Sequence, residues 1–540
     1  MKKQAKMIRY TSGEFGMKIY FPFNQTDLLI VKSMIGRRFN SVDKYWTAPI
    51  NLENYEKLIN GGWTVDEGLK KFFDRKTIVI DELDITNINI PQLGLPLFEY
   101  QKRGVAFIEH RGGRALIGDE MGLGKTAQAL AWVQMHPEIN KILIVVPASL
   151  KLNWRNELQM WTTRNRVEIL SGQTGGTISG DVVIINYDVL TNWHGSIVSW
   201  KPNVIIADEI HYTKNNKAKR TKALKSLAKI VPHFIALSGT PIVNRPVEFL
   251  NAIKMVDNTM FPNQWEFLKR YCGARNNGFG WDFSGATNTD ELHKLLTKSI
   301  MIRRLKKDVL KDLPDKIRSF TPCEINNYAE YDAADRDFIS YLKITKGQEA
   351  AVKASSAELL SQIEVLKQLA VQGKMEQAVS WIRDFLDSGE KLVVFATHRF
   401  VIDRLFKEFA GAVKIDGGVG QVDRQKAVER FQTDPDTRLF IGNIKAAGVG
   451  LTLTAASNVA FLELPWTPGE LIQAEDRCHR IGQKDTVNIY DLLAEGTIEQ
   501  DIARLLDKKR KVLDSVLDGT ATDSDGLLTE LIKNYKSQTT

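Results

Sequence analysis

The hydrophobic pattern between about residues 97 and 260 alternates between strand-like and helical stretches. Segments with helical periodicity, such as TAQALAWVQM and LKLNWRNELQMW, separate short apolar runs rich in β-branched residues. These runs have the length of strands buried on both faces: RALIGD (114–119), KILIVVP (141–147), DVVIINYD (181–188), NVIIAD (203–208) and HFIALSG (233–239). The alternation predicts a parallel sheet covered by helices.

The same alternation restarts near residue 386 and predicts a second α/β lobe over 386–496. Its apolar runs are KLVVFATH (391–398), TRLFIGN (437–443), NVAFLEL (458–464) and TVNIYDLL (486–493). We expect a first lobe over 91–260, a mostly helical region over 261–385 and a charged helical tail over 497–540. Residues 1–90 carry aromatics and short strand-like runs, which predict a small α+β domain.

Composition narrows the class of protein. The 540 residues are 43% hydrophobic and 26% charged, as in globular chains. The cysteines (272, 323 and 478) lie far apart, which argues against a zinc site or a disulfide framework and fits a reducing compartment. No apolar run approaches the ~18–20 residues of a membrane span, and MKKQAKMIRY lacks a secretory apolar core. The net charge of +8 favours a polyanionic partner, although an enzyme that is merely basic fits equally well.

The segment ALIGDEMGLGKTAQAL predicts a phosphate-binding loop between a strand and a helix. Gly122 and Gly124 let the backbone approach phosphate, and the helix N-terminus favours an anion. Lys125 would reach the β- and γ-phosphates, and the Thr126 hydroxyl would bind Mg²⁺. Asp119 stands where the pattern GxxxxGK[ST] has glycine, so the match depends on its context. The alternative is a generic strand–turn–helix corner.

A second signal is the pair Asp208-Glu209 after the apolar run NVIIA. Carboxylates at the end of a parallel strand face the crevice where α/β sheets bind ligands. We expect Asp208 to hold Mg²⁺ and Glu209 to orient and deprotonate the attacking water. His211 would couple this site to a partner site or merely pack. The later LSGTP (237–241), with Ser238 and Thr240, fits an ordinary strand-to-loop turn.

The second lobe contains PWTPGELIQAEDRCHRIGQ, which predicts a helix. Thr467 is a good N-cap, Pro468 suits the first helical position, Glu470 completes a capping box and Gly482 would end the helix. Two arginines on one helix face suit a γ-phosphate, as arginine fingers, although a solvated basic stripe is the alternative. The residues expected on that face are Gln473, Arg477 and Arg480.

These segments together resemble the SNF2 (Swi2/Snf2) family of superfamily 2 DNA translocases. The resemblance covers roughly residues 97–515 and rests on LFEYQKRGVAFI, DEMGLGKT, DEIH, LSGTP, AAGVGLTLTAAS and EDRCHRIGQ, in family order. It implies two tandem RecA-like lobes, ATP and Mg²⁺ as cofactors, and hydrolysis driven by duplex DNA. The nucleotide contacts implied are Gln101 (the adenine-reading glutamine), Asp119, Glu120, Met121, Gly122, Leu123, Gly124, Lys125, Thr126 and Gln473. The catalytic residues implied are Lys125, Asp208, Glu209, Arg477 and Arg480, with Thr126 and Asp208 as metal ligands.

Residues 14–60 resemble the HARP module of the SMARCAL1-like annealing-helicase branch. Basic residues beside aromatics suit a DNA junction, here Arg37, Arg38 and Trp46, although Trp46 would also serve as core. We also expect DNA contacts from Lys214, Lys217 and Arg220, which belong to a basic stretch whose alternative role is a solvated helix face. Gly448 and Gly450 would allow close approach to the DNA backbone, and their alternative role is close packing within the protein.

The function that follows is an ATP-dependent duplex-DNA translocase that remodels branched or forked DNA by annealing, fork reversal or branch migration. Two alternatives stay open: a strand-separating DNA or RNA helicase, and an ATP-dependent DNA clamp or recruitment protein without productive turnover. We expect a monomer in the cytoplasm of a bacterial or phage-infected cell, or in a nucleus if the source is eukaryotic. Protein partners are left open.

Overall fold

The structure is a computed structural model of residues 1–540. It describes residues 2–9, 15–34, 36–50, 52–74, 83–86, 88–172, 175–239, 246–261, 263–276, 280–283, 285–344, 352–447 and 450–517. The chain forms two compact units, Met1–Glu120 with Gly124–Leu305, and Lys306–Ser515 with Met121–Leu123. Each unit is described by itself.

The first unit begins with a small α+β module. Its sheet has the order β3(Arg38–Asn40)-β4(Tyr45–Pro49)-β2(Phe15–Tyr20)-β1(Gln4–Arg9)-β5(Thr64–Val65), and only the β1–β5 pair is parallel. The helices are α1 (Gln25–Lys32), α2 (Leu52–Asn60) and α3 (Glu67–Asp74). A core that includes Met17, Ile19 and Trp63 holds sheet and helices together. The sequence-based expectation of an α+β domain is confirmed here.

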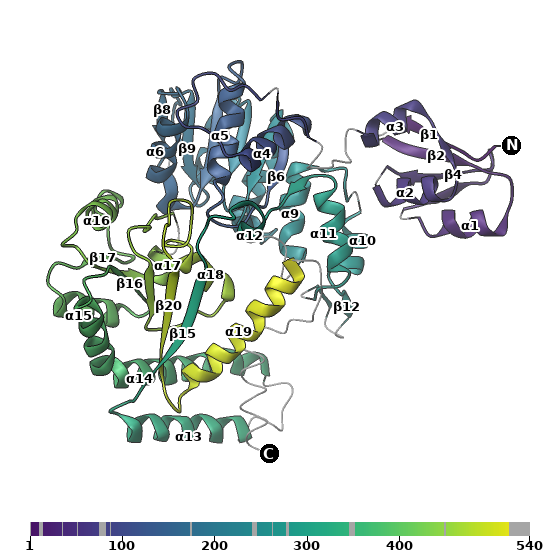
Figure 1. The fold of residues 1–540 in the computed structure, drawn as a ribbon. Coiled ribbons are helices and arrows are strands. Elements are labelled where there is room, and N and C mark those ends of the chain that lie inside the picture. Colours follow the sequence, from purple (N-terminus) through teal and green to yellow (C-terminus); the bar gives the residue numbers. More distant parts are fainter. Residues whose placement is uncertain are drawn as a thin grey trace. The chain divides into compact units, whose positions relative to one another are not determined.

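The larger part of the first unit is a seven-stranded parallel sheet with helices on both faces (Figure 1). The strand order is β14(Met301–Ile302)-β6(Arg114–Ile117)-β11(His233–Leu237)-β10(Val204–Ala207)-β7(Ile142–Val146)-β9(Val182–Asn186)-β8(Val167–Ile169). Helices α4 (Glu99–His110), α5 (Lys125–Met135), α6 (Lys151–Trp161), α7 (Leu190–Trp200), α8 (Lys219–Ile230) and α9 (Pro246–Val256) flank it. All five predicted strands are present; β7, β9 and β10 are buried throughout, and β6 and β11 are buried after their first residue.

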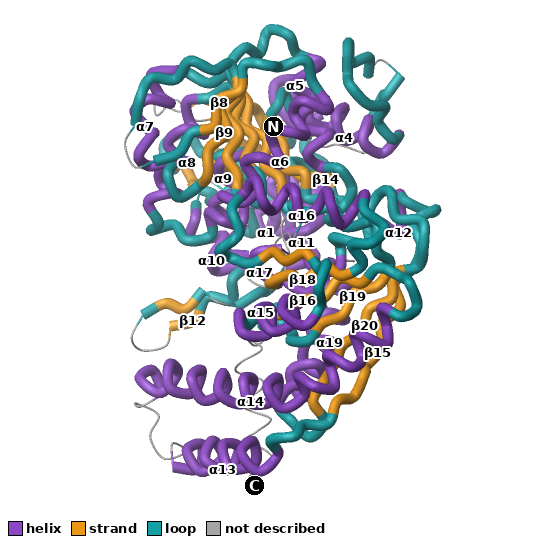
Figure 2. The backbone as a smooth tube through the Cα atoms, turned by 90° about the vertical axis from the view of Figure 1, so that its left-hand side faces the viewer, coloured by secondary structure: helices purple, strands orange, loops and turns teal. Residues whose placement is uncertain are grey.

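The second unit repeats this architecture with six parallel strands. Their order is β15(Lys316–Cys323)-β20(Val487–Ala494)-β19(Asn458–Phe461)-β16(Leu392–Ala396)-β18(Leu439–Asn443)-β17(Val413–Ile415). Its helices are α12 (Lys306–Val309), α13 (Tyr328–Ile344), α14 (Val352–Leu386), α15 (Arg399–Glu408), α16 (Gln421–Thr433), α17 (Ile444–Ala447), α18 (Pro468–Glu475) and α19 (Ile498–Leu517). Figure 2 shows α13 and the long α14 side by side. The prediction of two α/β lobes with parallel sheets is confirmed.

Residues 261–385 differ from the helical inter-lobe region that we expected. Helices α10 (Gln264–Tyr271) and α11 (Thr289–Thr297) and the hairpin β12(Arg275–Asn276)-β13(Trp281–Asp282) are followed by β14, which joins the first sheet. Strand β15 then joins the second sheet, so the segment is shared between both units. Short or half-exposed strands such as these lack the continuous apolar run of a buried strand. Among the described helices, none combines the length and apolar character that a membrane crossing requires.

Candidate nucleotide site

The predicted phosphate loop lies between β6 and α5. Helix α5 begins at Lys125, and Gly124 precedes it with a φ of 72°. Gly122 has a φ of 82°, so both glycines use the left-handed region that side chains disfavour. A Cβ on Gly124 would collide with the side-chain amide of Gln101, which is 2% exposed. Gln101, the expected adenine contact, therefore packs directly against the loop.

Lys125 lies among the charged groups expected at this site. Its Nζ donates to the backbone oxygens of Asp119 (3.0 Å) and Glu120 (3.3 Å). Burial lowers the pKa of Lys125, and the charges of Glu209, Asp119 and Asp208 oppose that shift. An ammonium held near a loop of backbone N–H groups is suited to a phosphate anion.

The contacts of the Asp119 side chain explain why aspartate replaces the glycine of the usual loop pattern. Its side chain is fully buried and accepts from Arg304 Nε (3.0 Å) and Gln128 Nε2 (3.0 Å), with a second ion-pairing contact from Arg304 Nη2. Arg304 also donates to the Tyr100 carbonyl and to Gln128 Oε1 (2.8 Å). The carboxylate thus anchors the loop to the protein.

The acidic pair follows the central strand β10, as predicted. Asp208 Oδ2 accepts from Trp154 Nε1 (2.8 Å) on α6, and its Oδ1 accepts from the Glu209 backbone N–H (2.9 Å). Burial and the neighbouring Glu209 charge raise the pKa of Asp208 to about 6. Glu209 has a φ of 49°, which is uncommon for a residue with a side chain and typical of strained functional positions. His211 Nδ1 lies 3.2 Å from Glu209 Oε2, so His211 contacts the acidic pair.

The donor chemistry of this site fits a magnesium ion. Asp208 and Glu209 are adjacent, partly buried carboxylates, and the charge of Glu209 opposes the ionisation of Asp208. A divalent cation would relieve this repulsion, and carboxylate and hydroxyl oxygens are ligands that Mg²⁺ accepts. Asp208 and Thr126 are the residues that would hold it. A bound Mg²⁺ would neutralise charge on phosphate oxygens.

The expected helix of the second unit is shorter than its sequence indicates. Thr467 caps α18 by accepting from the Glu470 backbone N–H (3.2 Å), and Pro468 opens the helix, as predicted. However, α18 ends at Glu475, and turns follow in place of a helix to Gly482. The prediction that Gln473, Arg477 and Arg480 share one helix face is therefore wrong.

The physical reason is a set of charges that holds the chain beyond α18. Asp476 lies 2.8 Å from Lys306 Nζ and 3.3 Å from Lys316 Nζ, and Glu475 pairs with Lys316 (3.0 Å) and Arg318. Burial alone would raise the pKa of Asp476, but Lys306 and Lys316 outweigh it and lower the pKa. Lys306 Nζ also donates to the His479 carbonyl (2.7 Å). These contacts accompany a tight turn in which the Arg477 and Cys478 N–H groups donate to the third preceding residue, while the His479 N–H donates to the fourth.

The turn nevertheless brings the two arginines to one point. Arg477 Nη1 (3.3 Å) and Arg480 Nη1 (3.2 Å) both donate to the Leu451 carbonyl. Arg477 Nε also donates to the backbone oxygen of Gln473 (2.9 Å). Gly450, next to Leu451, has a φ of 75°, so glycine is required at this bend. The guanidinium groups are thus pre-positioned together by a shared acceptor and not by helical spacing.

The expected DNA contacts are distributed over several surfaces. Arg37 and Arg38 are exposed, whereas Trp46 is half-buried and packs on the module core. The rings of Trp46 and Phe39 are tilted by 45°, with their centroids 5.0 Å apart. Lys214 and Lys217 are exposed, while Arg220 binds Asp188 (3.0 Å) and the Tyr212 carbonyl (3.2 Å). Gly448, Thr240 and Pro241 lie outside the described residues, and Ser238 is fully buried.

Three residues that contact predicted site residues or their neighbours escaped the sequence interpretation. Trp154 belongs to a segment that reads only as a helix, so nothing in the sequence links it to Asp208. Arg304 and Lys306 belong to the run MIRRLKKDV. Its basic cluster beside a short apolar stretch could have indicated that these residues bind buried acidic groups. Their acidic partners lie far along the chain, so only the fold reveals the pairs.

Comparison with known proteins places these features in a family. The SNF2-related domain matches residues 100–374, and the helicase conserved C-terminal domain matches residues 373–482. The Xenopus tropicalis SWI/SNF-related matrix-associated actin-dependent regulator of chromatin subfamily A-like protein 1 is 35% identical over 538 residues, covering 94% of this chain and 55% of the relative. Its Caenorhabditis elegans homolog is 34% identical over 519 residues, covering 92% and 74%. The mouse DNA annealing helicase and endonuclease ZRANB3 is 36% identical over 446 residues, covering 79% and 41%.

The chain spans about half the length of the frog and mouse relatives that it matches. The family match nevertheless includes both the phosphate loop and the segment with the two arginines. The chain therefore belongs to the SNF2-related family.

Proposed function

We propose that the chain is a DNA-dependent ATPase that translocates along duplex DNA and remodels branched or forked DNA. The observation that carries this proposal is the first unit's site, where Lys125 lies within electrostatic reach of Asp208 and Glu209 at the end of a buried parallel sheet. A lysine for phosphate, one acid for a metal ion and one acid for water are the groups that ATP hydrolysis needs. Gln101 beside the loop supports adenine as the base.

Within this proposal the other predicted residues take defined roles. Glu209 orients the attacking water, and Arg477 and Arg480 stabilise charge on the triphosphate as it develops. Thr126 and Asp208 would hold the Mg²⁺ ion that is bound together with ATP. The shared contact of both arginines with the Leu451 carbonyl supports a common target for the pair.

The N-terminal module is proposed to bind DNA junctions. The frog relative matches 94% of this chain, so its alignment includes part of the module. Arg37 and Arg38 are exposed beside Phe39, an aromatic that is 49% exposed. Exposed guanidinium and aromatic groups pair with phosphates and stack on unpaired bases.

The test is ATP turnover with Mg²⁺ in the presence of duplex DNA, single strands, forks or RNA. The proposal expects the largest stimulation by duplex or forked DNA, with Glu209→Gln as an inactive control. Greatest stimulation by single strands or RNA would favour a strand-separating helicase. DNA binding with no turnover would favour a clamp, and turnover without any DNA dependence would contradict the proposal.

The module is tested separately by Arg37→Gln with Arg38→Gln. We expect DNA-free turnover to be unchanged and the preference for forks over linear duplex to fall. An unchanged fork preference would show that these arginines do not contact the junction.

A further inference from the structure

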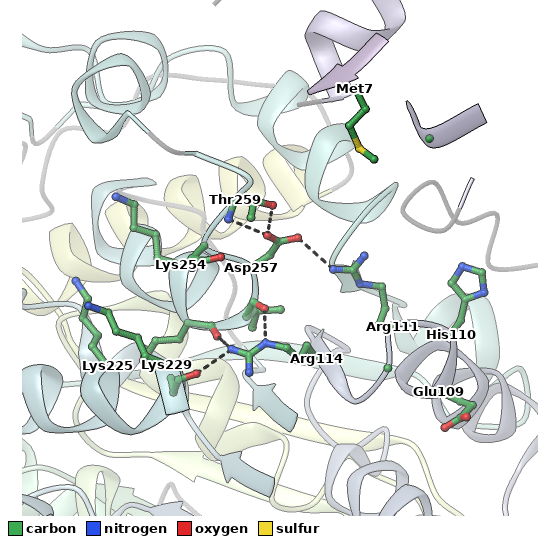
Figure 3. A pocket seen from close by; sticks show the side chains of 16 residues that line it. Met7, Glu109, His110, Arg111, Arg114, Lys225, Lys229, Lys254, Asp257 and Thr259 are labelled. Carbon is green, nitrogen blue, oxygen red and sulfur yellow. Dashed lines mark hydrogen bonds and ion pairs between the residues drawn. The ribbon is translucent and has the colours of Figure 1, made fainter. Parts of the chain in front are cut away.

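A cavity of about 1320 Å³ lies at the N-terminal ends of strands in the first parallel sheet (Figure 3). Arg114, the first residue of β6, lines it, together with residues at the ends of α8 and α9. The phosphate loop follows the other end of β6. The cavity therefore lies at the N-terminal ends of the strands, whereas the candidate nucleotide site lies at their C-terminal ends.

Two of the basic residues in this cavity serve the fold. The Arg114 guanidinium donates to the carbonyls of Val231 (3.0 Å), Ala228 (3.1 Å) and Val256 (3.1 Å). Arg111 pairs with Asp257 at 3.4 Å. Arg114 thus binds the ends of neighbouring elements and Arg111 binds Asp257, so these arginines shape the wall of the cavity.

The lysines that line the cavity form what we call the lysine cluster, Lys225, Lys229 and Lys254. Figure 3 shows Lys225 and Lys229 side by side, with Lys254 above them. Lys225 Nζ donates to the amide oxygens of Asn216 (2.9 Å) and Asn251 (3.2 Å). Glu109 and Asp257 also line the cavity, and among the described residues the Asp257 carboxylate pairs with Arg111 and not with any of the three lysines.

The cluster is electrostatically unfavourable in the protein alone. Burial lowers the pKa of Lys225, and the positive charges of Lys254 and Lys229 lower it further. Burial likewise lowers the pKa of Lys254. Like charges gathered without ion-pair partners of their own work against folding, and such exceptions to favourable local electrostatics are characteristic of functional sites.

We propose that the lysine cluster is a second DNA-backbone site, which binds successive phosphate groups of a duplex. Lys225 and Lys229 are one helical turn apart on α8, so they share a face, and Lys254 approaches from α9. Ammonium groups on flexible stems neutralise phosphates without reading sequence. This inference rests on the proposed DNA function but adds a contact that the nucleotide site does not provide.

The test is the salt dependence of duplex binding by Lys229→Gln with Lys254→Gln. The matched control is Lys294→Gln with Lys407→Gln, which removes the same charge from exposed positions on α11 and α15. Each lost phosphate contact lowers the slope of log K against log salt by about 0.9. We expect the magnitude of this negative slope to fall by about 1–2 in the cluster variant and to equal that of wild type in the control. DNA-free ATP turnover should be unchanged in both variants.

The outcomes separate this inference from the proposed function. Equal slopes for the cluster variant and the control, with DNA-stimulated turnover intact, would overturn the lysine cluster site alone. Absence of DNA binding by the wild-type chain would overturn the proposed function as well.

Acylation of Lys229 and Lys254 should be slowed by duplex DNA. Protection by tripolyphosphate but not by duplex would identify a site for free phosphate anions and overturn the backbone assignment.

Discussion

Replacing Asp119 with glycine tests the physical account of the phosphate loop. Asp119→Gly restores the glycine of the common GxxxxGK[ST] pattern, so motif matching alone expects a neutral or favourable change. The structure predicts the reverse, because Asp119 is fully buried and its carboxylate is the ionic partner of Arg304, whose side chain is 10% exposed. Removing one partner of a buried pair leaves an uncompensated charge.

The expected cost follows from that geometry. Breaking a buried ion pair from one side typically costs about 3–5 kcal/mol. The loss of the Gln128 hydrogen bond adds to the same effect. We therefore expect Asp119→Gly to lower the free energy of unfolding, measured by urea titration and tryptophan fluorescence, by about 3 kcal/mol or more, and to weaken ATP binding.

A double variant makes the reasoning refutable. Replacing both partners of a buried pair with apolar groups is often nearly neutral, so Asp119→Ala with Arg304→Met should recover much of the lost stability. Glu120→Gly, which alters the next loop position without touching the Arg304 pair, is the control. A stable Asp119→Gly variant, or a double variant no better than the single one, would refute the anchoring role.

Further expectations concern the acids and the arginine. Glu209→Gln should retain ATP affinity in fluorescence titrations while turnover stalls. Arg480→Ala should lower kcat by about 10³–10⁵-fold with little change in the ATP dissociation constant, because finger contacts strengthen in the transition state; a parallel loss of affinity would contradict a finger. The pKa of Asp208 near 6 predicts that kcat/KM for ATP falls as pH drops below about 6. Trp154→Phe removes a hydrogen bond that lowers this pKa, so that midpoint should move to higher pH.

The same raised pKa has an opposite consequence for stability. Because the folded-state pKa of Asp208 lies above the ordinary value of 3.8, ionised Asp208 penalises the fold at neutral pH, and the penalty disappears below about pH 4. Asp208→Asn should therefore raise the free energy of unfolding at pH 7 by about 1–3 kcal/mol while abolishing turnover. Equal stability of variant and wild type across this pH range would show that Asp208 is not destabilised by burial.

The local sequence determined the buried strands and the loops that follow them. Continuous apolar runs identify strands covered on both faces, and the glycines and Lys125 identify the loop after β6, because these features depend only on neighbouring residues. The acidic pair after β10 was found for the same reason. Short edge strands such as β8 and β14 were missed because they contain too few residues for a periodic pattern.

Tertiary structure alone decided which distant charges meet. Asp119 and Arg304 are 185 residues apart, and Lys306 meets the backbone of His479 across 173 residues. Helical periodicity predicted that α18 would continue to Gly482. The ion-pair partners of Glu475 and Asp476 end the helix at Glu475, and a turn then positions Arg477 and Arg480. Pairwise electrostatics of buried groups depend on distance in space, and sequence spacing does not encode that distance.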